Sequence, residues 1–529
     1  MKLSLDGIKN AASWKAAGIT LPQYDTEAMS ALTKKAPIWV HFGAGNIFRG
    51  YVAGLQNALL NRGLAEKGIV AVDSSDGDQI VKVYRPFDNL TLLVSLHADG
   101  SSDKEVIASI AEAIHADWNK ADQLARLKEI FRDPGLQMCS FTITEKGYVN
   151  KGEADFAGGP EAPVSVMAKV TAMLLERFRA GKLPMAVVSM DNCSHNGEKL
   201  KNSVVQIASE WAKRGFVPAE FVEYISDESV VSFPWSMIDK ITPRPNGDIA
   251  KQLGELGVEA MDIIPREKGA PVAPFVNAEA PQYLVIEDRF PNGRPAFEKV
   301  GVYMTDRDTV NMTERMKVTT CLNPLHTALA VLGCLLGYDR IYKEMQDPDL
   351  KALVERIGYV EGMPVVTDPK ILSPMDFLNE VIQKRLPNPY IPDMPQRIAC
   401  DTSHKVPVRF GETIKSYLAS SALDLNSLKA IPFACAAWLR YLLAVDDKMQ
   451  PMQLSDDPMI PELQTKLSGI EAGKPESYSG QLAGILCNAD IFGADLTATV
   501  LKEKIEKYFV SMLAGEDAVR NALHAVVSE

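Results

Sequence analysis

The sequence is short of positive charge. It holds 56 Lys and Arg residues against 68 Asp and Glu residues, which gives a formal net charge of -12 and a pI near 5.3. Nucleic acids and anionic membranes repel such a chain unless a local basic patch compensates, and we find no such patch in the sequence. We therefore expect neither a nucleic-acid partner nor a membrane partner.

Cysteine is also sparse, and its spacing excludes several kinds of site. The chain has 7 cysteines without a CxxC pair or a zinc-like spacing, at positions 139, 193, 321, 334, 400, 435 and 487. An odd number of cysteines without a pattern argues against a disulfide framework and against a structural metal. We expect reduced, mostly buried thiols and no metal site.

Long apolar runs are missing as well. The first residues, Met-Lys-Leu-Ser-Leu-Asp, lack the apolar core of a secretory signal. No run approaches the roughly 18 apolar residues that span a bilayer. These features predict a cytoplasmic protein.

Apolar residues are nevertheless abundant enough for a large core. With 529 residues and 46% hydrophobic content, the chain is too long for one ordinary domain. Short apolar segments alternate with helical patterns up to about residue 305, as in a parallel sheet covered by helices. We predict an α/β fold, with a Rossmann-type doubly wound sheet domain at residues 1–305 and a mainly α-helical domain at residues 306–529. The clearest strands are Ile38–Phe42, Gly68–Val72, Cys139–Ile143 and Met185–Ser189, and the clearest later helices contain Leu325–Leu336 and Ile431–Leu439.

A glycine-rich turn follows the first predicted strand. Gly43 and Gly45 precede the helical pattern of Tyr51–Leu60, so backbone amides and the helix dipole can hold a pyrophosphate there. Phe48 stands where the usual GxGxxG motif has its third glycine. A tight strand-to-helix turn without a ligand would use the same residues.

The next predicted strand ends at Asp73. A carboxylate in this place can accept hydrogen bonds from an adenosine ribose and would repel a 2′-phosphate, which favours NAD over NADP. Asp73 also fits a turn or a helix cap. We expect the cofactor to contact Gly43, Gly45, Asn46, Arg49 and Asp73.

Two further predicted strands run into polar clusters, residues 142–148 and residues 189–197. In open α/β sheets, ligands gather at the carboxyl ends of the strands. The second cluster contains Asn192 and leads into a helix that begins near Glu198. Turns and helix caps use the same residue types, so each cluster alone has an ordinary structural explanation.

A lysine, an asparagine and a histidine lie among apolar residues near the middle of the chain. They are Lys317, Asn323 and His326. Apolar surroundings make such groups costly unless they are paired or used. A lysine that loses hydration also loses proton affinity and becomes a usable general base near neutral pH. An amphipathic helix with a snorkelling lysine and a hydrogen-bonded core histidine would contain the same residues.

Taken together, these blocks resemble the polyol-specific long-chain dehydrogenases, the mannitol dehydrogenase family, over nearly the whole chain. The blocks that carry the resemblance are GAGNIFRG, TITEKGY, SMDNCSHNG, FPWSMIDKITP, VIEDRFPNGRP, KVTTCLNPLHTALA and NADIFGADL. The resemblance implies a Rossmann-type domain, a helical C-terminal domain, an NAD cofactor and chemistry without a metal.

The resemblance also implies roles for individual residues. Lys317 matches the catalytic base, and Asn192 and Asn323 match the pair that holds the reacting oxygen. His326 matches the residue that orients the substrate, and Glu314 matches the acid that links the lysine to solvent. Glu145 matches a glutamate that can gate proton traffic, although a salt bridge to Lys146 or another surface cation explains it equally well.

One spacing departs from the family pattern. Lys317 and Asn323 are six residues apart, whereas the family has five. On a regular helix at roughly 100° per residue, Lys317 would lie about 180° from His326. The backbone must therefore be irregular, either because Asn323 caps a helix that starts at Pro324 or because a π-bulge inserts one residue.

A later basic segment, residues 397–409, indicates the class of substrate. By the resemblance, Asp239, Arg397 and Lys405 match substrate-lining residues. The pattern from Lys405 to Arg409 resembles that of the hexuronate reductases more than that of the mannitol enzymes, and a guanidinium suits a planar carboxylate. We expect D-mannonate and D-fructuronate, with mannitol and fructose second and tagaturonate also open. A solvated basic stretch would have the same residues.

Two other function classes stay open. A sugar-acid epimerase with tightly held NAD would use the same lysine and nucleotide site, and a silent NAD-binding sensor would lose part of the lysine and asparagine constellation. The chain keeps that constellation, which favours an NAD-dependent secondary-alcohol dehydrogenase acting on a small sugar acid or polyol. We expect it to work as a monomer, as family members often do.

Overall fold

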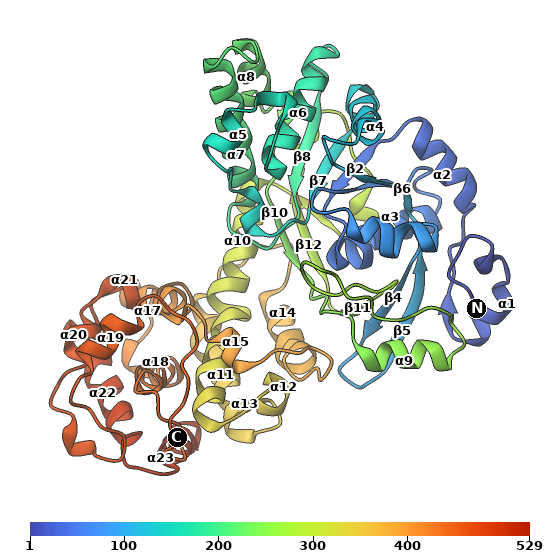
Figure 1. Ribbon diagram of the computed structural model, residues 1–529. Helices are drawn as coiled ribbons and strands as arrows, with labels where there is room; N and C mark the ends of the chain where they lie inside the picture. The colour runs from blue at the N-terminus through green and yellow to red at the C-terminus, as the bar shows by residue number, and fades with distance from the viewer. Residues whose placement is uncertain (529) are drawn as a thin grey trace. The chain divides into compact units, whose positions relative to one another are not determined.

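The computed structural model describes residues 1–528 (Figure 1). The chain divides into two compact units, Met1–Asn311 and Met312–Glu529. Strands β1 to β13 all lie in the first unit, and no strand lies in residues 312–528. The predicted contrast between an α/β part and a mainly helical part is confirmed.

A six-stranded parallel sheet organises the first unit. Its order is β6-β3-β2-β7-β8-β9, so the chain starts near the centre and winds to both sides, as in the Rossmann fold. The strands overlap the four predicted ones. Their bounds are β2 Trp39–Phe42, β3 Ile69–Asp73, β6 Ile110–His115, β7 Met138–Phe141, β8 Met185–Ser189 and β9 Val231–Ser232.

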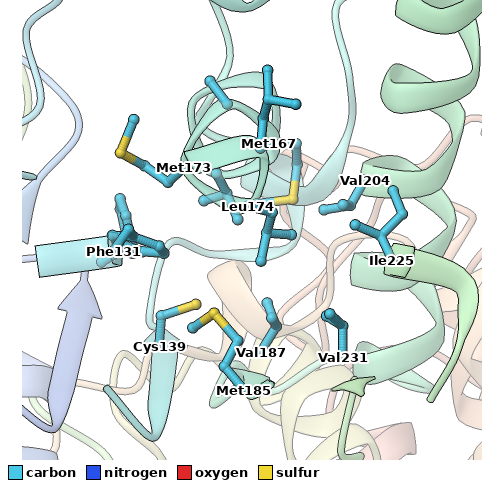
Figure 2. Close-up of a cluster of buried hydrophobic side chains, with 14 of the residues drawn as sticks. Phe131, Cys139, Met167, Met173, Leu174, Met185, Val187, Val204, Ile225 and Val231 are labelled. Atoms are coloured by element: carbon cyan, nitrogen blue, oxygen red, sulfur yellow. The ribbon is translucent and has the colours of Figure 1, made fainter. Parts of the chain in front are cut away.

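One face of this sheet is covered by four helices. They are α4 (Ala121–Arg132), α6 (Val166–Arg179), α7 (Asn196–Lys213) and α8 (Ala219–Ser226). Figure 2 shows Met167, Met173 and Leu174 of α6 facing Cys139 of β7 and Val187 of β8, all fully buried. The apolar residues of these strands are therefore buried by side-chain packing against the covering helices.

The opposite face packs against α3 (Ala53–Asn61) and two smaller sheets. Trp39, Met138 and Val188 of the central sheet share a core with Leu93 of β4 and Val276 of β11. Because both faces are covered, strands β2, β3, β7 and β8 are buried at every position. The smaller sheets were not predicted. They have the orders β1-β5-β4-β11 and β10-β12-β13, with bounds β1 Ile19–Thr20, β4 Thr91–Leu96, β5 Ser102–Ile107, β10 Ser236–Asp239, β11 Phe275–Glu279, β12 Tyr283–Glu287 and β13 Tyr303–Thr305.

The second unit is built around one buried helix, α11 (Asn323–Leu336). It packs on α15 (Pro395–Ile398), on α18 (Ala430–Tyr441) and on the π-helical turn η8 (Lys317–Cys321). The predicted helical segments at 325–336 and 431–439 are thus confirmed. Other helices of this unit are α12 Ile341–Glu344, α13 Pro348–Glu355, α14 Pro374–Glu380, α16 Thr402–Val406, the π-helical turn η12 Pro407–Gly411, α17 Glu412–Ala419, α19 Ile460–Lys466, α22 Leu501–Ser511 and α23 Ala518–Ser528.

One helical stretch corrects the expectation that no segment could span a bilayer. Arg307–Leu336, which joins α10 (Arg307–Met316), η8 and α11, contains an 18-residue window that is long and apolar enough by composition. In the structure 83% of that window is buried. A helix buried in protein to this extent is apolar because it forms core, so the window is weak evidence for a membrane span.

Candidate functional site

The glycine-rich turn after β2 is held close to the neighbouring strand. Gly43 has φ +115°, and a Cβ there would lie 2.2 Å from the carbonyl oxygen of Thr142. A Cβ on Gly45 would meet no atom within 4 Å. Gly43 is therefore required by the protein's own packing, whereas the space beside Gly45 is open to a ligand that approaches the backbone.

Phe48, which replaces the third glycine of the motif, points into the core. It is fully buried and stacks on His41 with ring centroids 4.1 Å apart and an interplanar angle of 6°. The His41 ring nitrogens lie 2.7 Å from Ser140 Oγ and 2.8 Å from Thr142 Oγ1. Burial lowers the pKa of His41 well below its usual range, so the ring is neutral. The substitution leaves the turn intact because the phenyl group fills core space.

Two of the predicted cofactor contacts, Asn46 and Arg49, have hydrogen-bond partners within the protein. Arg49 is 0% exposed and donates to Ala273 O and to Asn46 Oδ1, both at 2.9 Å. Asn46 in turn donates to Pro243 O at 3.2 Å. Two of the guanidinium nitrogens of Arg49 are thus bonded within the protein, whereas its Nε has no hydrogen-bond partner among residues 1–528. These contacts fix the loop that carries Asn46.

Asp73 at the end of β3 keeps one oxygen free. It is 3% exposed, and its Oδ1 accepts hydrogen bonds from the backbone N–H and the hydroxyl of Ser75, at 2.8 and 2.5 Å. Its Oδ2 is buried and has no hydrogen-bond partner among residues 1–528. A buried acceptor without a partner is costly unless a ligand supplies the donor, and a ribose hydroxyl is such a donor. Asp73 and Gly45 therefore both fit an NAD cofactor.

The two predicted polar clusters are joined by Asp191. Its carboxylate accepts from Ile143 N at 2.8 Å, from Thr144 N at 3.0 Å and from Tyr148 OH at 2.6 Å. Burial raises the pKa of Asp191, and these hydrogen bonds oppose the rise. The clamp fixes the backbone directly before Asn192, the predicted oxyanion residue.

Glu145 and Asp239 occupy different surroundings. Glu145 forms an ion pair with Lys199 of α7, so the surface-cation explanation of Glu145 has direct support. Asp239 is the last residue of β10 and is 5% exposed. Its position at a strand end fits a substrate-binding role.

The backbone around Lys317 is irregular, as the spacing requires. Residues Lys317–Cys321 form a π-helical turn, in which Leu322 N bonds Lys317 O at 3.1 Å. Helix α11 begins at Asn323 itself, without a side-chain cap, so the π-bulge and not the capping arrangement is found. With one residue absorbed by the bulge, Lys317 and His326 are about 80° apart at roughly 100° per residue. Lys317 is 2% exposed, and Glu314 lies one turn before it in α10.

His326 and Arg397 meet at a residue that the sequence did not reveal. Asp393 Oδ2 lies 3.3 Å from His326 Nε2, and Asp393 Oδ1 accepts from Arg397 Nη2 at 2.6 Å. Burial alone would raise the pKa of Asp393, but His326 and Arg397 hold it below its usual range. Asp393 stands in a loop far from His326 in sequence, so no local pattern could indicate the contact.

Lys405 and Arg409 lack a carboxylate partner. Lys405 Nζ donates to the carbonyls of Ile398 and Cys400, and Arg409 Nη1 donates to Thr327 Oγ1. Neither forms a salt bridge within residues 1–528. Burial, reinforced by Arg409 and opposed by Asp401, Cys400 and Asp457, lowers the pKa of Lys405, and burial lowers the pKa of Arg409 to about 10. The contact with Thr327 ties the Arg409 guanidinium to the first turns of α11, the helix that also carries His326.

Metal-binding groups and disulfides are the next features to consider in the part of the chain that the structure describes. Within residues 1–528, no group of three His, Cys, Asp or Glu side chains is arranged to hold a metal ion, and all seven cysteines are free. The second unit thus contains the buried Lys317 in a π-helical turn and His326 beside Asp393. It also contains Lys405 and Arg409, whose hydrogen bonds go to neutral oxygens.

Comparison with known proteins gives consistent matches over the full chain. Residues 37–299 match the mannitol dehydrogenase Rossmann domain, and residues 309–513 match the mannitol dehydrogenase C-terminal domain. The D-mannonate oxidoreductase of Thermotoga maritima is 50% identical over an alignment of 543 residues, which covers 100% of this chain and 99% of that protein.

Two solved structures share the fold. The mannitol 2-dehydrogenase of Pseudomonas fluorescens, in a ternary complex with NAD and D-mannitol, has a TM-score of 0.71 at 26% identity and covers 100% of both chains. A D-sorbitol dehydrogenase in substrate-free form has a TM-score of 0.77 at 25% identity and covers 96% of this chain and 98% of its own.

Proposed function

Because the chain belongs to the mannitol dehydrogenase family and is an NAD-dependent oxidoreductase, we propose that it interconverts D-mannonate and D-fructuronate. The observation that carries this choice of substrate is the pair of unneutralised cations, Lys405 and Arg409. Mannitol and fructose carry no charge, whereas mannonate and fructuronate carry one carboxylate.

Two half-buried cations without an anion are costly. Each loses hydration, and the hydrogen bonds that replace it go to neutral oxygens of the protein. A bound carboxylate would restore the missing charge, and a guanidinium can donate two parallel hydrogen bonds to its oxygens. An uncharged polyol would leave both cations uncompensated.

Arg397 differs from this pair in a way that supports the assignment. Its side chain is 69% exposed, and Asp393 already neutralises it at 2.6 Å. We therefore assign the substrate carboxylate to Arg409 and Lys405, and a hydroxyl contact to Arg397. Asp239, in the first unit, is assigned to substrate hydroxyls as well.

NAD supplies the hydride acceptor when it is bound. The free oxygen of Asp73 is the proposed acceptor for the adenosine ribose, and the open space beside Gly45 is the proposed path of the pyrophosphate. A 2′-phosphate would face the Asp73 carboxylate at close range, which supports NAD over NADP.

The proton steps are assigned to residues of this chain. In oxidation Lys317 takes the hydroxyl proton, and the amides of Asn192 and Asn323 stabilise the alkoxide character that develops on that oxygen. In reduction Lys317 as an ammonium returns the proton to the same oxygen. Glu314, one turn earlier, exchanges the proton of Lys317 with solvent, and His326 orients the substrate.

A substrate panel tests the proposal. We expect kcat/KM for NADH oxidation with D-fructuronate, and for NAD reduction with D-mannonate, to exceed the values for fructose and mannitol by at least about 100-fold, since a lost charge-assisted pair costs several kcal/mol. Equal or better turnover of the uncharged pair would refute the uronate assignment. Turnover of a sugar acid without net NADH change would indicate an epimerase.

A matched pair of arginine variants tests the carboxylate site. Arg409→Met keeps the volume but removes the charge, and we expect it to lower kcat/KM for D-mannonate by about 100-fold while that for mannitol changes by less than about threefold. Arg340→Met, at a surface arginine beside Asp339, is the control and should change neither value. An equal loss with both substrates would contradict recognition of the carboxylate.

We also propose that the enzyme works as a cytoplasmic monomer. Seven free cysteines are consistent with a reducing compartment, and the family resemblance suggests a monomer. Light scattering of the purified protein tests the oligomeric state. A dimer that persists at nanomolar concentration would contradict it.

A further inference from the structure

Asp393 makes the only carboxylate contact that the structure gives to His326. Its Oδ2 lies 3.3 Å from His326 Nε2, while its Oδ1 accepts from Arg397. Nε2 is shut off from solvent and has no well-aligned hydrogen-bond partner among residues 1–528. Contacts of this kind are often long before the substrate binds and tighten in the complex.

The imidazole is not wholly enclosed. The side chain of His326 keeps 20% of its exposure although Nε2 is buried. The ring edge that carries Nδ1 is therefore the part that a ligand can reach. A neutral imidazole offers one donor and one acceptor, so the partner of Nε2 decides what Nδ1 presents.

We propose that Asp393 is the positioning residue of His326: it fixes the proton on Nε2, so that Nδ1 accepts a hydrogen bond from a substrate hydroxyl. With its other oxygen it holds Arg397 in the same arrangement. This inference rests on the proposed function, in which His326 orients the substrate. The role is that of the carboxylate behind a catalytic histidine, which selects the tautomer without touching the substrate.

The loop that carries Asp393 is rigid enough for this role. Pro392 precedes it and Pro395 follows it, and both rings fix their φ angles. The carbonyl of Asp393 accepts from Ile341 N at 3.1 Å, at the start of α12. His326 and Arg397 together hold the pKa of Asp393 below its usual range although burial opposes them, so the carboxylate stays ionised at neutral pH.

The other charged groups packed around α11 do not compete for Nε2. Arg409 of η12 bonds Thr327, Lys405 of α16 bonds backbone carbonyls, and Glu344 of α12 faces Gly333 at the other end of the helix. Asp393 is thus the group that decides the tautomer.

Substitution of Asp393 tests the inference. Asn at position 393 can donate to Nε2 and so favours the opposite tautomer. We expect Asp393→Asn to lower kcat/KM for D-mannonate by roughly 10- to 100-fold with the KM for NAD unchanged, and Asp393→Glu to recover part of that loss. Wild-type kinetics in Asp393→Asn would overturn the inference.

A double-mutant cycle separates positioning from a purely structural role. In a His326→Ala background, Asp393→Asn should change kcat/KM by less than about twofold, because the residue acts through the missing imidazole. Independent, multiplicative losses would overturn the inference. If His326→Ala itself has wild-type kinetics, the proposed role of His326 fails; if it is impaired and Asp393→Asn is not, only the role of Asp393 fails.

The tautomer of His326 can also be measured in the wild-type enzyme, so the test does not depend on whether a variant folds. Nitrogen NMR of protein with labelled histidine, with the His326 signal assigned by its loss in His326→Asn, should show the proton on Nε2. A proton on Nδ1 in the neutral ring would overturn the inference.

Discussion

The two units present their functional residues in different ways. In the first unit, Gly45, Asp73 and Asn192 lie at or shortly after the carboxyl ends of parallel strands, so the edge of the sheet sets where they lie. In the second unit, Lys317 and His326 are set by the phase of a helix that one π-helical turn shifts. A loop after a strand can adjust locally, whereas helix phase moves by about 100° with each residue.

Buried carboxyl groups also have different surroundings in the two units. Asp73 keeps a free oxygen at the edge of the sheet, where a ligand can reach it. Glu344 is 0% exposed, and both of its oxygens lack a hydrogen-bond partner inside a helical core, where a Cβ on Gly333 would lie 2.3 Å from Oε1. Burial raises the pKa of Glu344 well above its usual range, so it is held as a neutral acid. A free oxygen thus indicates a ligand only where a ligand has access.

The largest expected effect belongs to the lysine of the second unit. Lys317→Ala should lower kcat about 1,000-fold, since a general base contributes roughly 10²- to 10⁴-fold. NADH affinity, which depends on the first unit, should change by less than about twofold in a fluorescence titration. Lys343→Ala, at a surface lysine paired with Asp339, is the control with expected wild-type turnover. Retained turnover in Lys317→Ala would remove Lys317 from the mechanism.

The next effect tests helix phase directly. Deletion of Val318 gives the family spacing of five residues between Lys317 and Asn323, and we expect it to keep activity within about tenfold. Insertion of one alanine after Val318 turns the lysine away and should lower kcat about 100-fold, because a displacement of about 1 Å already costs this much. Circular dichroism checks that both variants are folded. If the two changes had equal effects, helix phase would not be the deciding factor.

A smaller effect is expected at the sheet edge. In Asp73→Asn the amide oxygen is needed by Ser75 N, so the amide nitrogen takes the place of the free oxygen and cannot accept from a ribose. We expect the KM for NAD to rise about tenfold, with kcat at saturating NAD nearly unchanged. Asp76→Asn, at the residue that pairs with Arg266, serves as the control. An unchanged KM would show that Asp73 does not contact the cofactor.

Glu344 should affect stability and leave turnover unchanged. Its folded-state pKa is raised, so the stability it contributes is full below the unfolded pKa near 4.3 and is lost as pH rises toward the folded value. Wild type should therefore lose stability relative to Glu344→Gln by up to about 1.4 kcal/mol per pH unit in that window. Urea unfolding between about pH 5 and about pH 8 measures this difference. Glu462→Gln, at a surface glutamate paired with Lys466, should show no such trend, and a flat difference for Glu344→Gln would mean that the acid ionises freely.

Much of the fold follows from sequence pattern because its elements are locally periodic. The parallel strands of the first unit are continuous apolar runs, and α11 and α18 are long apolar helices. The four-stranded sheet β1-β5-β4-β11 was not predicted, because β5 begins with Ser-Asp-Lys-Glu before it becomes apolar. Such a sequence carries no clear strand pattern. Strand pairing between β4 and β11 joins segments far apart in the chain, and no local pattern indicates such a pairing.

The candidate site likewise contains residues that the local sequence indicated and residues that only the folded structure showed. Residue types alone singled out Lys317, Asn323 and His326, and their spacing alone required an irregular backbone, which the π-helical turn provides. Arg49 is fully buried, which its motif did not indicate, since a motif places a residue near a turn but cannot say whether its side chain faces in or out. Asp393 was missed because its partner His326 is distant in the chain.

The sequence by itself determined the family and the alternation of an α/β unit and a helical unit, and it indicated Lys317 as the proposed base, because these depend on residue types and short spacings. The tertiary structure alone decided which charges are neutralised. Asp393 pairs with Arg397 and leaves Lys405 and Arg409 without an anion, which separates one arginine of the segment from the other. Charge neutralisation depends on distances of a few ångströms between distant residues, and only the folded chain fixes those distances.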